Sequence, residues 1–467
     1  MSVPSLLSAS PETFALRRGR GVFSLHATGV RHPSLFSGER FTAYTEITQL
    51  LETRGALRMG TRSTVHRFRR SLFVDPGDPA RLQRALLDRI AREPGGARQL
   101  ARMADLDPLR RARAPVRATL VLALTCVLVY VLQRRFDPDL WLAGLFSTTL
   151  FWAGELWRVL TANLLHANVP HLVANVLFIL AVGAFIEGAL GAMRTAFVMG
   201  SSALGAMGAS LASVDEQVVG ASGIVLGLIG AALWLEFRCA DRLPVTWRAP
   251  RWLLLALLTF AAIETVFLPG VAAAAHLGGF VGGIAATAAV APSGLRREGA
   301  RPWLTLANTA LAVGAVLSIA AVAGEVRGDA ALLTRRGTKL LRLTDVSPLL
   351  LNNTAWMIAT SARATPEQAA VAVRLAERAV EATGRQDPNL LDTLAESQFA
   401  AGRPEDAVET IDEAIALRPE EPYFTEQRRR FTGDRGRDDR PSPPPEEDEP
   451  APREAPPSPA ENPGVNV

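Results

Sequence analysis

Seven apolar runs, each close to the length of a membrane-spanning helix, occupy the middle of this 467-residue chain. A helix needs about 20 apolar residues to cross the hydrocarbon core of a bilayer. Because lipid offers the backbone no hydrogen-bond partner, such runs must satisfy their own N–H and C=O groups. We therefore predict a polytopic α-helical membrane protein. The runs lie at 117–133, 170–189, 193–213, 220–237, 251–269, 274–292 and 303–325.

Charge between the runs predicts the orientation, because short loops rich in Lys and Arg stay in the cytoplasm. Basic residues precede the first run and also lie between runs two and three, four and five, and six and seven, whereas 214–217 and 268–271 contain none. This pattern places the N-terminus in the cytoplasm and the chain after the seventh run outside. Basic residues after the seventh run weaken that last assignment; they are Arg327, Arg335, Arg336, Lys339 and Arg342.

Composition limits the possible partners and the cellular location of the protein. A net charge of +4 gives no reason to expect nucleic-acid binding, and two cysteines, Cys126 and Cys239, build no disulfide framework. The first ten residues lack a basic start followed by an apolar run, so we expect no cleavable signal peptide. The Arg-, Ala- and Pro-rich composition and the short loops favour a bacterial inner (cell) membrane.

A polar region, 1–112, precedes the first span. Short strands are predicted at 21–25, 41–47, 64–68 and 71–74, followed by a helix at 78–92. Strands closed by one amphipathic helix resemble a pleckstrin-homology-like domain. Such a domain would dock on lipid or protein, with Arg67, Arg69 and Arg70 available to anionic headgroups; the alternative is a plain soluble cap. Between the first two spans, 134–166 is rich in Trp and Phe, which indicates an interfacial hairpin.

The region after the last span is predicted to be helical over 337–430. Two Pro-Glu pairs, at Pro366 and Pro404, each open a helix and lie 38 residues apart, near the tetratricopeptide period of about 34. One or two such hairpins resemble a tetratricopeptide module that binds a peptide or protein partner. Because three repeats are the usual minimum, the segment 337–351 or a partner would be needed to complete the core. The tail, 434–467, is Pro- and acid-rich and is predicted to be disordered.

Two polar residues within the apolar runs suggest chemistry. Ser222 lies between Gly220 and Gly223 at the start of the fourth run, and His276 lies near the start of the sixth. Ionisable groups in a membrane are costly, so they indicate function by default. Both residues lie at similar depth near the outer surface, where a histidine base can activate a serine. Gly279 and Gly283 form a small-xxx-small contact that brings helices close.

The second run adds hydrogen-bond donors. His166, His171 and Asn175 are spaced five and four residues apart, so His171 and Asn175 share a helical face on which they can stabilise an oxyanion. Taken singly, a Gly-rich serine motif more often serves helix packing, and a lone histidine is more often a bonded polar group. Serine, asparagine and three histidines at one depth favour catalysis.

Together these motifs resemble the rhomboid family of intramembrane serine proteases. The motifs are Glu155-x-Trp157-Arg158, His166-x4-His171-x3-Asn175, Gly220-x-Ser222-Gly223 and Ala275-His276-x2-Gly279-x3-Gly283. The resemblance implies a six-helix core at 113–292, followed by a seventh transmembrane helix at 303–325. Ser222 would be the nucleophile and His276 the base, with His171, Asn175 and the Ser222 N–H as the oxyanion hole.

The same resemblance assigns supporting roles. His166 would be structural or organise water, Trp157 and Arg158 would stabilise the outer loop, and Glu187 would match an acid at the inner end of the second span. One departure is Leu226, at a position where family members often carry an aromatic ring that stacks on the histidine.

We therefore expect a serine endopeptidase that cuts transmembrane substrates at or near the outer end of their helix, without cofactor or metal. Two alternatives remain open. One is a catalytically silent rhomboid-like protein that binds transmembrane helices as a scaffold or adaptor. The other is a scaffold whose end domains dominate while the core serves as an anchor.

Overall fold

The fold is known from a computed structural model that describes residues 12–17, 21–34, 38–111, 116–136, 139–212, 217–267, 272–291, 301–361, 364–436 and 439–441. Two compact units divide the chain, Met1–Val326 and Arg327–Val467. Each is described here by itself.

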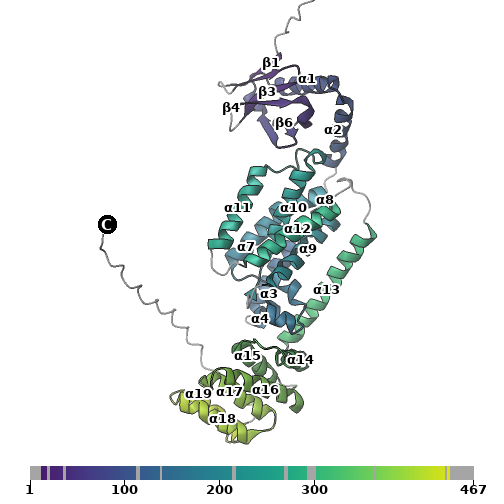
Figure 1. Ribbon diagram of the computed structural model, residues 1–467. Coiled ribbons are helices and arrows are strands. Elements are labelled where there is room, and N and C mark those ends of the chain that lie inside the picture. Colours follow the sequence, from purple (N-terminus) through teal and green to yellow (C-terminus); the bar gives the residue numbers. More distant parts are fainter. Residues whose placement is uncertain are drawn as a thin grey trace, which may run out of the picture. The chain divides into compact units, whose positions relative to one another are not determined.

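The first unit begins with seven strands in two antiparallel sheets (Figure 1). The four-stranded sheet runs in the order β1–β2–β3–β4, and the three-stranded sheet in the order β5–β6–β7. Their apolar faces meet around Phe23, Tyr44 and Phe73. The strands are β1 (Glu12–Ala15), β2 (Val22–Leu25), β3 (Gly29–Ser34), β4 (Gly38–Ala43), β5 (Ile47–Glu52), β6 (Ala56–Thr61) and β7 (Val65–Arg69).

Helix α1 (Asp78–Arg92) closes this core with the stripe Leu82, Leu86 and Ile90, which recurs every four residues and is fully buried. Its bounds agree with the predicted 78–92. Helix α2 (Gly96–Arg111), which follows, was not predicted. The β-rich region is therefore present, while its identity as a pleckstrin-homology domain remains a prediction.

Two of the predicted strands were wrong. The segment 41–47 is broken by the 3-10 turn η2 (Tyr44–Glu46), where the buried Tyr44 hydroxyl donates to the His26 carbonyl over 2.9 Å. The segment 71–74 is instead the 3-10 turn η3 (Arg70–Leu72) followed by an isolated bridge from Phe73 to Leu16. The pattern of apolar residues did not reveal either turn, because each predicted strand also contains a buried aromatic ring, Tyr44 in one and Phe73 in the other.

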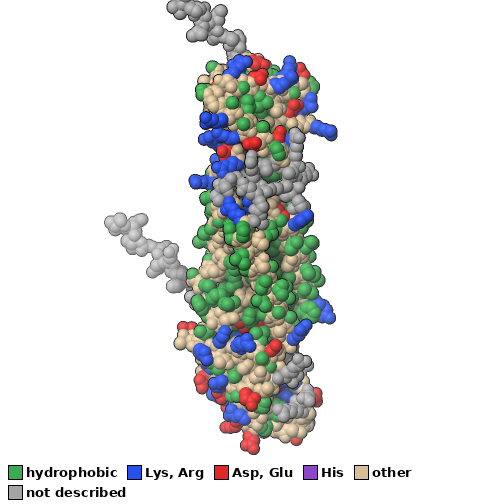
Figure 2. Space-filling view, turned by 90° about the vertical axis from the view of Figure 1, so that its right-hand side faces the viewer, with side chains coloured by type: hydrophobic (Ala, Val, Ile, Leu, Met, Phe, Trp, Pro, Cys, Tyr) green, Lys and Arg blue, Asp and Glu red, His purple; other side chains and the backbone are tan. Residues whose placement is uncertain are grey.

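Each of the seven apolar runs contains a helix, and hydrophobic side chains dominate the face of the bundle seen in Figure 2. Among the described residues, four helices are long and apolar enough to cross a membrane: Ala118–Arg135, Val169–Leu190, Ala273–Val290 and Pro302–Val326. Seven crossings and their orientation remain predictions. The helices are α3 (Ala118–Arg135), α7 (Val169–Phe178) continued by the π-turn η5 (Ile179–Gly183) and α8 (Ala184–Leu190), α9 (Ala192–Ser210), α10 (Ser222–Arg238), α11 (Arg251–Phe267), α12 (Ala273–Val290) and α13 (Pro302–Val326).

Glycines let α10 and α12 touch backbone to backbone. A Cβ added at Gly279 would lie 2.1 Å from the Gly223 carbonyl oxygen, and one at Gly283 would lie 2.1 Å from the Gly227 carbonyl oxygen. Helix α9 lies on the other side of the same contact, where a Cβ at Gly227 would lie 2.0 Å from Ser202 Oγ. These three helices pack closely, because no side chain separates α10 from α12 and only small side chains such as Ser202 separate α9 from α10.

Short elements make up the described part of 139–164, and the interfacial position predicted for this segment remains a prediction. They are α4 (Asp139–Gly144), β8 (Phe146–Ser147), α5 (Thr148–Trp152), α6 (Arg158–Thr161) and η4 (Ala162–Leu164). Strand β8 pairs with β9 (Gln217–Val218), which leads directly into α10. Several of the predicted loop residues, 213–216 and 268–271, lie outside the described residues.

The second unit consists of helices packed in pairs. Pro366 and Pro404 open α16 and α18, as predicted, and α14 and α15 pack against α16. A tetratricopeptide identity remains a prediction, and most of the predicted disordered tail, 442–467, lies outside the described residues. The helices are α14 (Ala330–Leu340), α15 (Pro348–Ala359), α16 (Pro366–Ala382), α17 (Pro388–Ala400), α18 (Pro404–Leu417) and α19 (Pro422–Phe431).

Candidate active site

The serine and the histidine meet across the glycine contact between α10 and α12. Helix α10 begins at Ser222, whose Oγ lies 2.8 Å from His276 Nε2. The two side chains are half-buried. This distance is that of an O–H···N hydrogen bond between a nucleophile and a base. The close approach follows from Gly223 and Gly279, since a side chain at either position would push the helices apart.

A second hydroxyl orients the histidine. Thr265 Oγ1 of α11 lies 2.7 Å from His276 Nδ1, and the same hydroxyl donates to the Ala261 carbonyl over 2.7 Å. A hydroxyl carries one proton, so with that proton on Ala261 the oxygen can only accept from the imidazole. Nδ1 therefore carries the hydrogen, and Nε2 presents a lone pair to Ser222. The orientation of the base is thereby determined by a hydrogen bond.

Several hydrogen-bond donors lie beside Ser222. Gly220 has φ +115° and its N–H donates to the Ala162 carbonyl over 2.8 Å, so the chain turns sharply before α10. A Cβ at Gly220 would lie 2.8 Å from His171 Nε2 and 3.8 Å from Asn175 Nδ2. Among the described residues, the buried Asn175 Nδ2 has no hydrogen-bond partner. An unpaired buried amide next to the first N–H groups of α10 suits a developing negative charge.

His166 lies before the second span rather than on it, which corrects its predicted position. Helix α7 begins at Val169, and Asn168 caps it by accepting the N–H of His171 over 2.9 Å. His166 is fully buried, and its ring meets that of His171 edge to face with centroids 5.2 Å apart. Gln133 of α3 holds its backbone by bonding both its N–H and its C=O. His166 therefore supports the ring of His171.

Arg158, the first residue of α6, binds the backbone of the segment that leads into β8. It is fully buried and donates to the Leu142 and Leu145 carbonyls over 2.7 and 2.8 Å. Its remaining nitrogens bond Glu155 over 2.6 Å and Glu325 of α13 over 3.2 Å. Trp157 Nε1 donates to the neighbouring Ala143 carbonyl over 3.3 Å. Two carboxylates and two carbonyls thus compensate for burying this cation.

Glu187 acts at the opposite end of the second span. Its carboxylate accepts the N–H groups of Arg117, Ala118 and Thr119, at 2.7, 3.0 and 2.9 Å, and the Thr119 hydroxyl at 2.8 Å. These are the unpaired donors at the start of α3, where a negative charge also meets the positive end of the helix dipole. Glu187 therefore caps a neighbouring helix and lies apart from the serine.

Three site residues were absent from the sequence prediction: Thr265, Gln133 and Glu325. Each is a polar residue within an apolar run or at its end, which is the signal that revealed Ser222 and His276. Which of them reaches the site depends on helix rotation, and periodicity alone does not determine that. Leu226, at the expected aromatic position, is buried in the core.

Comparisons with known proteins agree with this geometry. The family model of the Rhomboid domain matches residues 153–293, which contain Ser222, His276, Thr265, His171 and Asn175. RHOMBOID-like protein 5 of Arabidopsis thaliana is 34% identical over 154 residues, covering 31% of this chain and 48% of the relative. Putative rhomboid protease YdcA of Bacillus subtilis is 33% identical over 132 residues (28% of this chain, 65% of the relative). Rhomboid protease GluP of the same species is 30% identical over 176 residues (37% of this chain, 33% of the relative). The chain thus spans about half the length of the first of these relatives.

Proposed function

Because residues 153–293 match the family model of the Rhomboid domain, we propose that the chain is an intramembrane serine endopeptidase. The observation that carries the proposal is the 2.8 Å contact between Ser222 Oγ and His276 Nε2, with Nδ1 held by Thr265. A serine for helix packing alone needs no oriented base. Bacillus relatives named as rhomboid proteases support the same reading.

The reaction proceeds in two halves. The Ser222 hydroxyl gives its proton to His276 Nε2 as Oγ bonds the carbonyl carbon of the substrate peptide, and the carbonyl oxygen becomes an oxyanion. Asn175, His171 and the Ser222 N–H stabilise that charge. His276 then protonates the leaving amine, the C–N bond breaks, and an acyl-enzyme remains. Water attacks this ester and gives a proton to His276. The bond between the carbonyl carbon and Ser222 Oγ then breaks, His276 returns the proton to Oγ, and the acid product leaves.

The substrate is a transmembrane protein, since the dyad lies among apolar helices. Its helix must unwind at the cut, because the backbone C=O groups of a helix are already bonded. Small or helix-weakening residues at the outer end of the substrate helix are therefore expected. The catalytic groups named here are protein side chains and backbone, so the mechanism requires no cofactor.

A fluorescent fluorophosphonate tests the proposal on purified full-length protein in detergent. We expect the native protein to be labelled and both Ser222→Ala and His276→Ala to lose the label, because only a serine with a base attacks phosphorus quickly. Ser201→Ala, on α9, is a matched control that should label normally. Labelling that persists in Ser222→Ala would contradict the protease. Absence of labelling in the folded native protein would favour the silent protein that binds transmembrane helices.

A further inference from the structure

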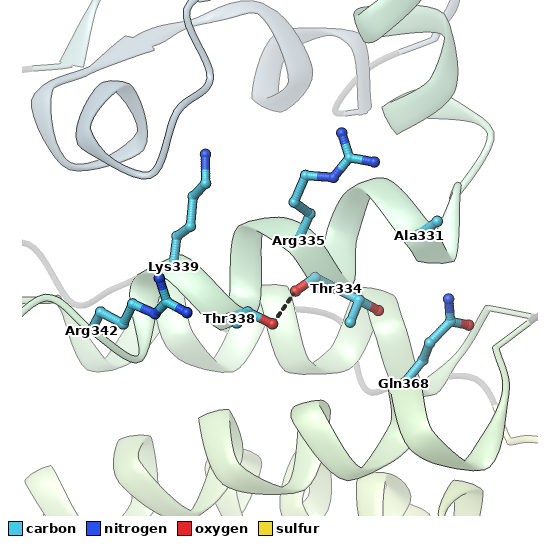
Figure 3. A pocket seen from close by; sticks show the side chains of 7 residues that line it. All are labelled: Ala331, Thr334, Arg335, Thr338, Lys339, Arg342 and Gln368. Atoms are coloured by element: carbon cyan, nitrogen blue, oxygen red, sulfur yellow. Dashed lines mark hydrogen bonds between the residues drawn. The ribbon is translucent and has the colours of Figure 1, made fainter.

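A basic concavity lies on α14, the helix that follows the last apolar run. Its volume is about 410 Å³, and it is lined by Ala331, Thr334, Arg335, Thr338, Lys339, Arg342 and Gln368. Figure 3 shows the three cations on one side of α14 with Gln368 near the start of α16. The positions 335, 339 and 342 recur at helical spacing, so they share one face. The lining contains no acidic residue.

The opposite face of α14 is already occupied. Leu333, Gly337 and Leu340 are buried, and a Cβ at Gly337 would lie 2.6 Å from Leu375 of α16. Arg335 and Arg342 are exposed, and Lys339 is half-exposed. Within the described part of the chain, no carboxylate pairs with these three side chains. They therefore leave a concentrated positive charge that the fold itself does not neutralise.

Hydrogen-bond accounting identifies the kind of ligand. The Thr334 hydroxyl donates to the Ala330 carbonyl over 2.6 Å, and the Thr338 hydroxyl donates to the Thr334 carbonyl over 2.9 Å, so neither proton is available. Gln368 Oε1 accepts the Thr365 N–H over 2.9 Å, which leaves the Gln368 NH₂ free to donate. Three cations and one amide are all donors, which suits an oxyanion such as a phosphate.

The short connection between α13 and α14 indicates that the phosphate belongs to a lipid. Helix α13 ends at Val326 and α14 begins at Ala330, so only three residues separate them. At about 3.5 Å per residue, the start of α14 lies within about 14 Å of the end of the apolar helix. Headgroups extend several ångströms beyond the hydrocarbon core, so a helix tethered this closely to the apolar helix is within reach of them.

From these observations we propose that the α14 concavity binds the phosphate of an anionic phospholipid in the bilayer that α13 enters. Arg335, Lys339 and Arg342 supply the charge, and the Gln368 amide supplies a neutral donor. The site would hold the second unit against the membrane surface. It is independent of the protease reaction and uses none of the residues around Ser222.

The test compares two triple variants of the full-length protein in uncharged detergent. Arg335→Gln, Lys339→Gln and Arg342→Gln together remove the three positive charges that line the concavity. Arg374→Gln, Arg418→Gln and Arg429→Gln remove the same charge from other helices of the same unit. Calorimetric titration uses dioctanoyl phosphatidylglycerol, dioctanoyl phosphatidylcholine and inorganic phosphate as probes, and a thermal melt checks folding.

We expect the α14 variant to bind phosphatidylglycerol at least tenfold more weakly than the native protein and the control variant, because each cation near an anionic surface contributes about fivefold. Equal binding by the two variants would overturn the proposal. So would phosphatidylcholine or inorganic phosphate binding the native protein as tightly as phosphatidylglycerol, the latter because the site would then be for a free anion. If the variant of Arg335, Lys339 and Arg342 melts at a lower temperature than the native protein, Arg342→Gln alone replaces it. Arg342 lies beyond the end of α14, and its single substitution should weaken phosphatidylglycerol binding severalfold.

Discussion

At the scale of single residues, Thr265 and Asn175 are the side chains that support the proposed dyad of Ser222 and His276. The Thr265 hydroxyl holds the tautomer of His276, and the Asn175 amide lies unpaired beside Gly220. Leu226 offers no ring to stack on the histidine. A hydrogen bond from Thr265 of α11 therefore orients His276, where an aromatic ring would otherwise be expected to do so. The position of α11 thus determines which nitrogen of His276 carries the hydrogen.

Thr265→Val should lower kcat/KM for a transmembrane substrate about fivefold to tenfold, since a neutral hydrogen bond contributes about 1 kcal/mol. Thr265→Ser keeps the hydroxyl and should stay near the native rate. The pH profile should also change in Thr265→Val alone, because the imidazole loses its acceptor. Equal rates for the two variants would show that packing alone orients His276.

Asn175→Ala should reduce kcat by about 100-fold and leave KM nearly unchanged, because the amide meets the charge only in the transition state. Steady-state cleavage of a reconstituted substrate measures both constants. Asn163→Ala serves as a control, since its amide donates to the Val159 carbonyl. A rise in KM with kcat intact would place Asn175 in substrate binding instead.

Helices α9, α10 and α12 form the element that positions the site. Their glycines remove the side chains that would keep Ser222 and His276 apart. The loop that leads to β8 is held separately by Arg158, which joins α6 to α13 through Glu325. The seventh helix is therefore packed into the domain as one of its structural supports.

Gly283→Ala should destabilise the bundle strongly, because the new Cβ would lie 2.1 Å from the Gly227 carbonyl oxygen, a backbone atom that cannot move alone. Gly188→Ala, in α8, meets nothing within 4 Å and should be neutral or slightly stabilising. Thermal denaturation in detergent compares them. If both melt together with the native protein, the helices are looser than this contact implies.

At the scale of the whole molecule, the second unit is compact by itself and carries a buried acid that makes its stability depend on pH. Asp392 is buried, bonded by the Tyr423 hydroxyl and the Gln427 amide at 3.0 Å each. Burial raises the pKa of Asp392 to about 7. In the unfolded chain the same carboxyl has a pKa of about 4.

Between these two values the folded unit holds a proton that the unfolded chain has lost, so its stability falls as pH rises from about 4 to about 7. Residues 328–440 expressed alone should fold, and urea unfolding should give a lower free energy at pH 7.5 than at pH 5. Asp392→Asn removes the titration and should flatten the difference. A wild-type slope of opposite sign, or one kept by Asp392→Asn, would contradict this account.

By itself the sequence determined the helical membrane region, the α1 stripe and the helix starts at Pro366 and Pro404. These follow from local rules, namely run length, periodicity and the preference of proline for the first turn. It also singled out Ser222, His276, His171 and Asn175, because polar groups in apolar runs are conspicuous.

Tertiary structure alone decided the turn inside 41–47, the place of His166 before α7 and the partners Thr265 and Glu325. Each depends on contacts between segments far apart in the chain. Tyr44 bonds His26 across the β-rich region, and Thr265 meets His276 only because α11 presents that face to α12. Helix rotation and packing determine these contacts, and neither can be predicted from the local sequence pattern.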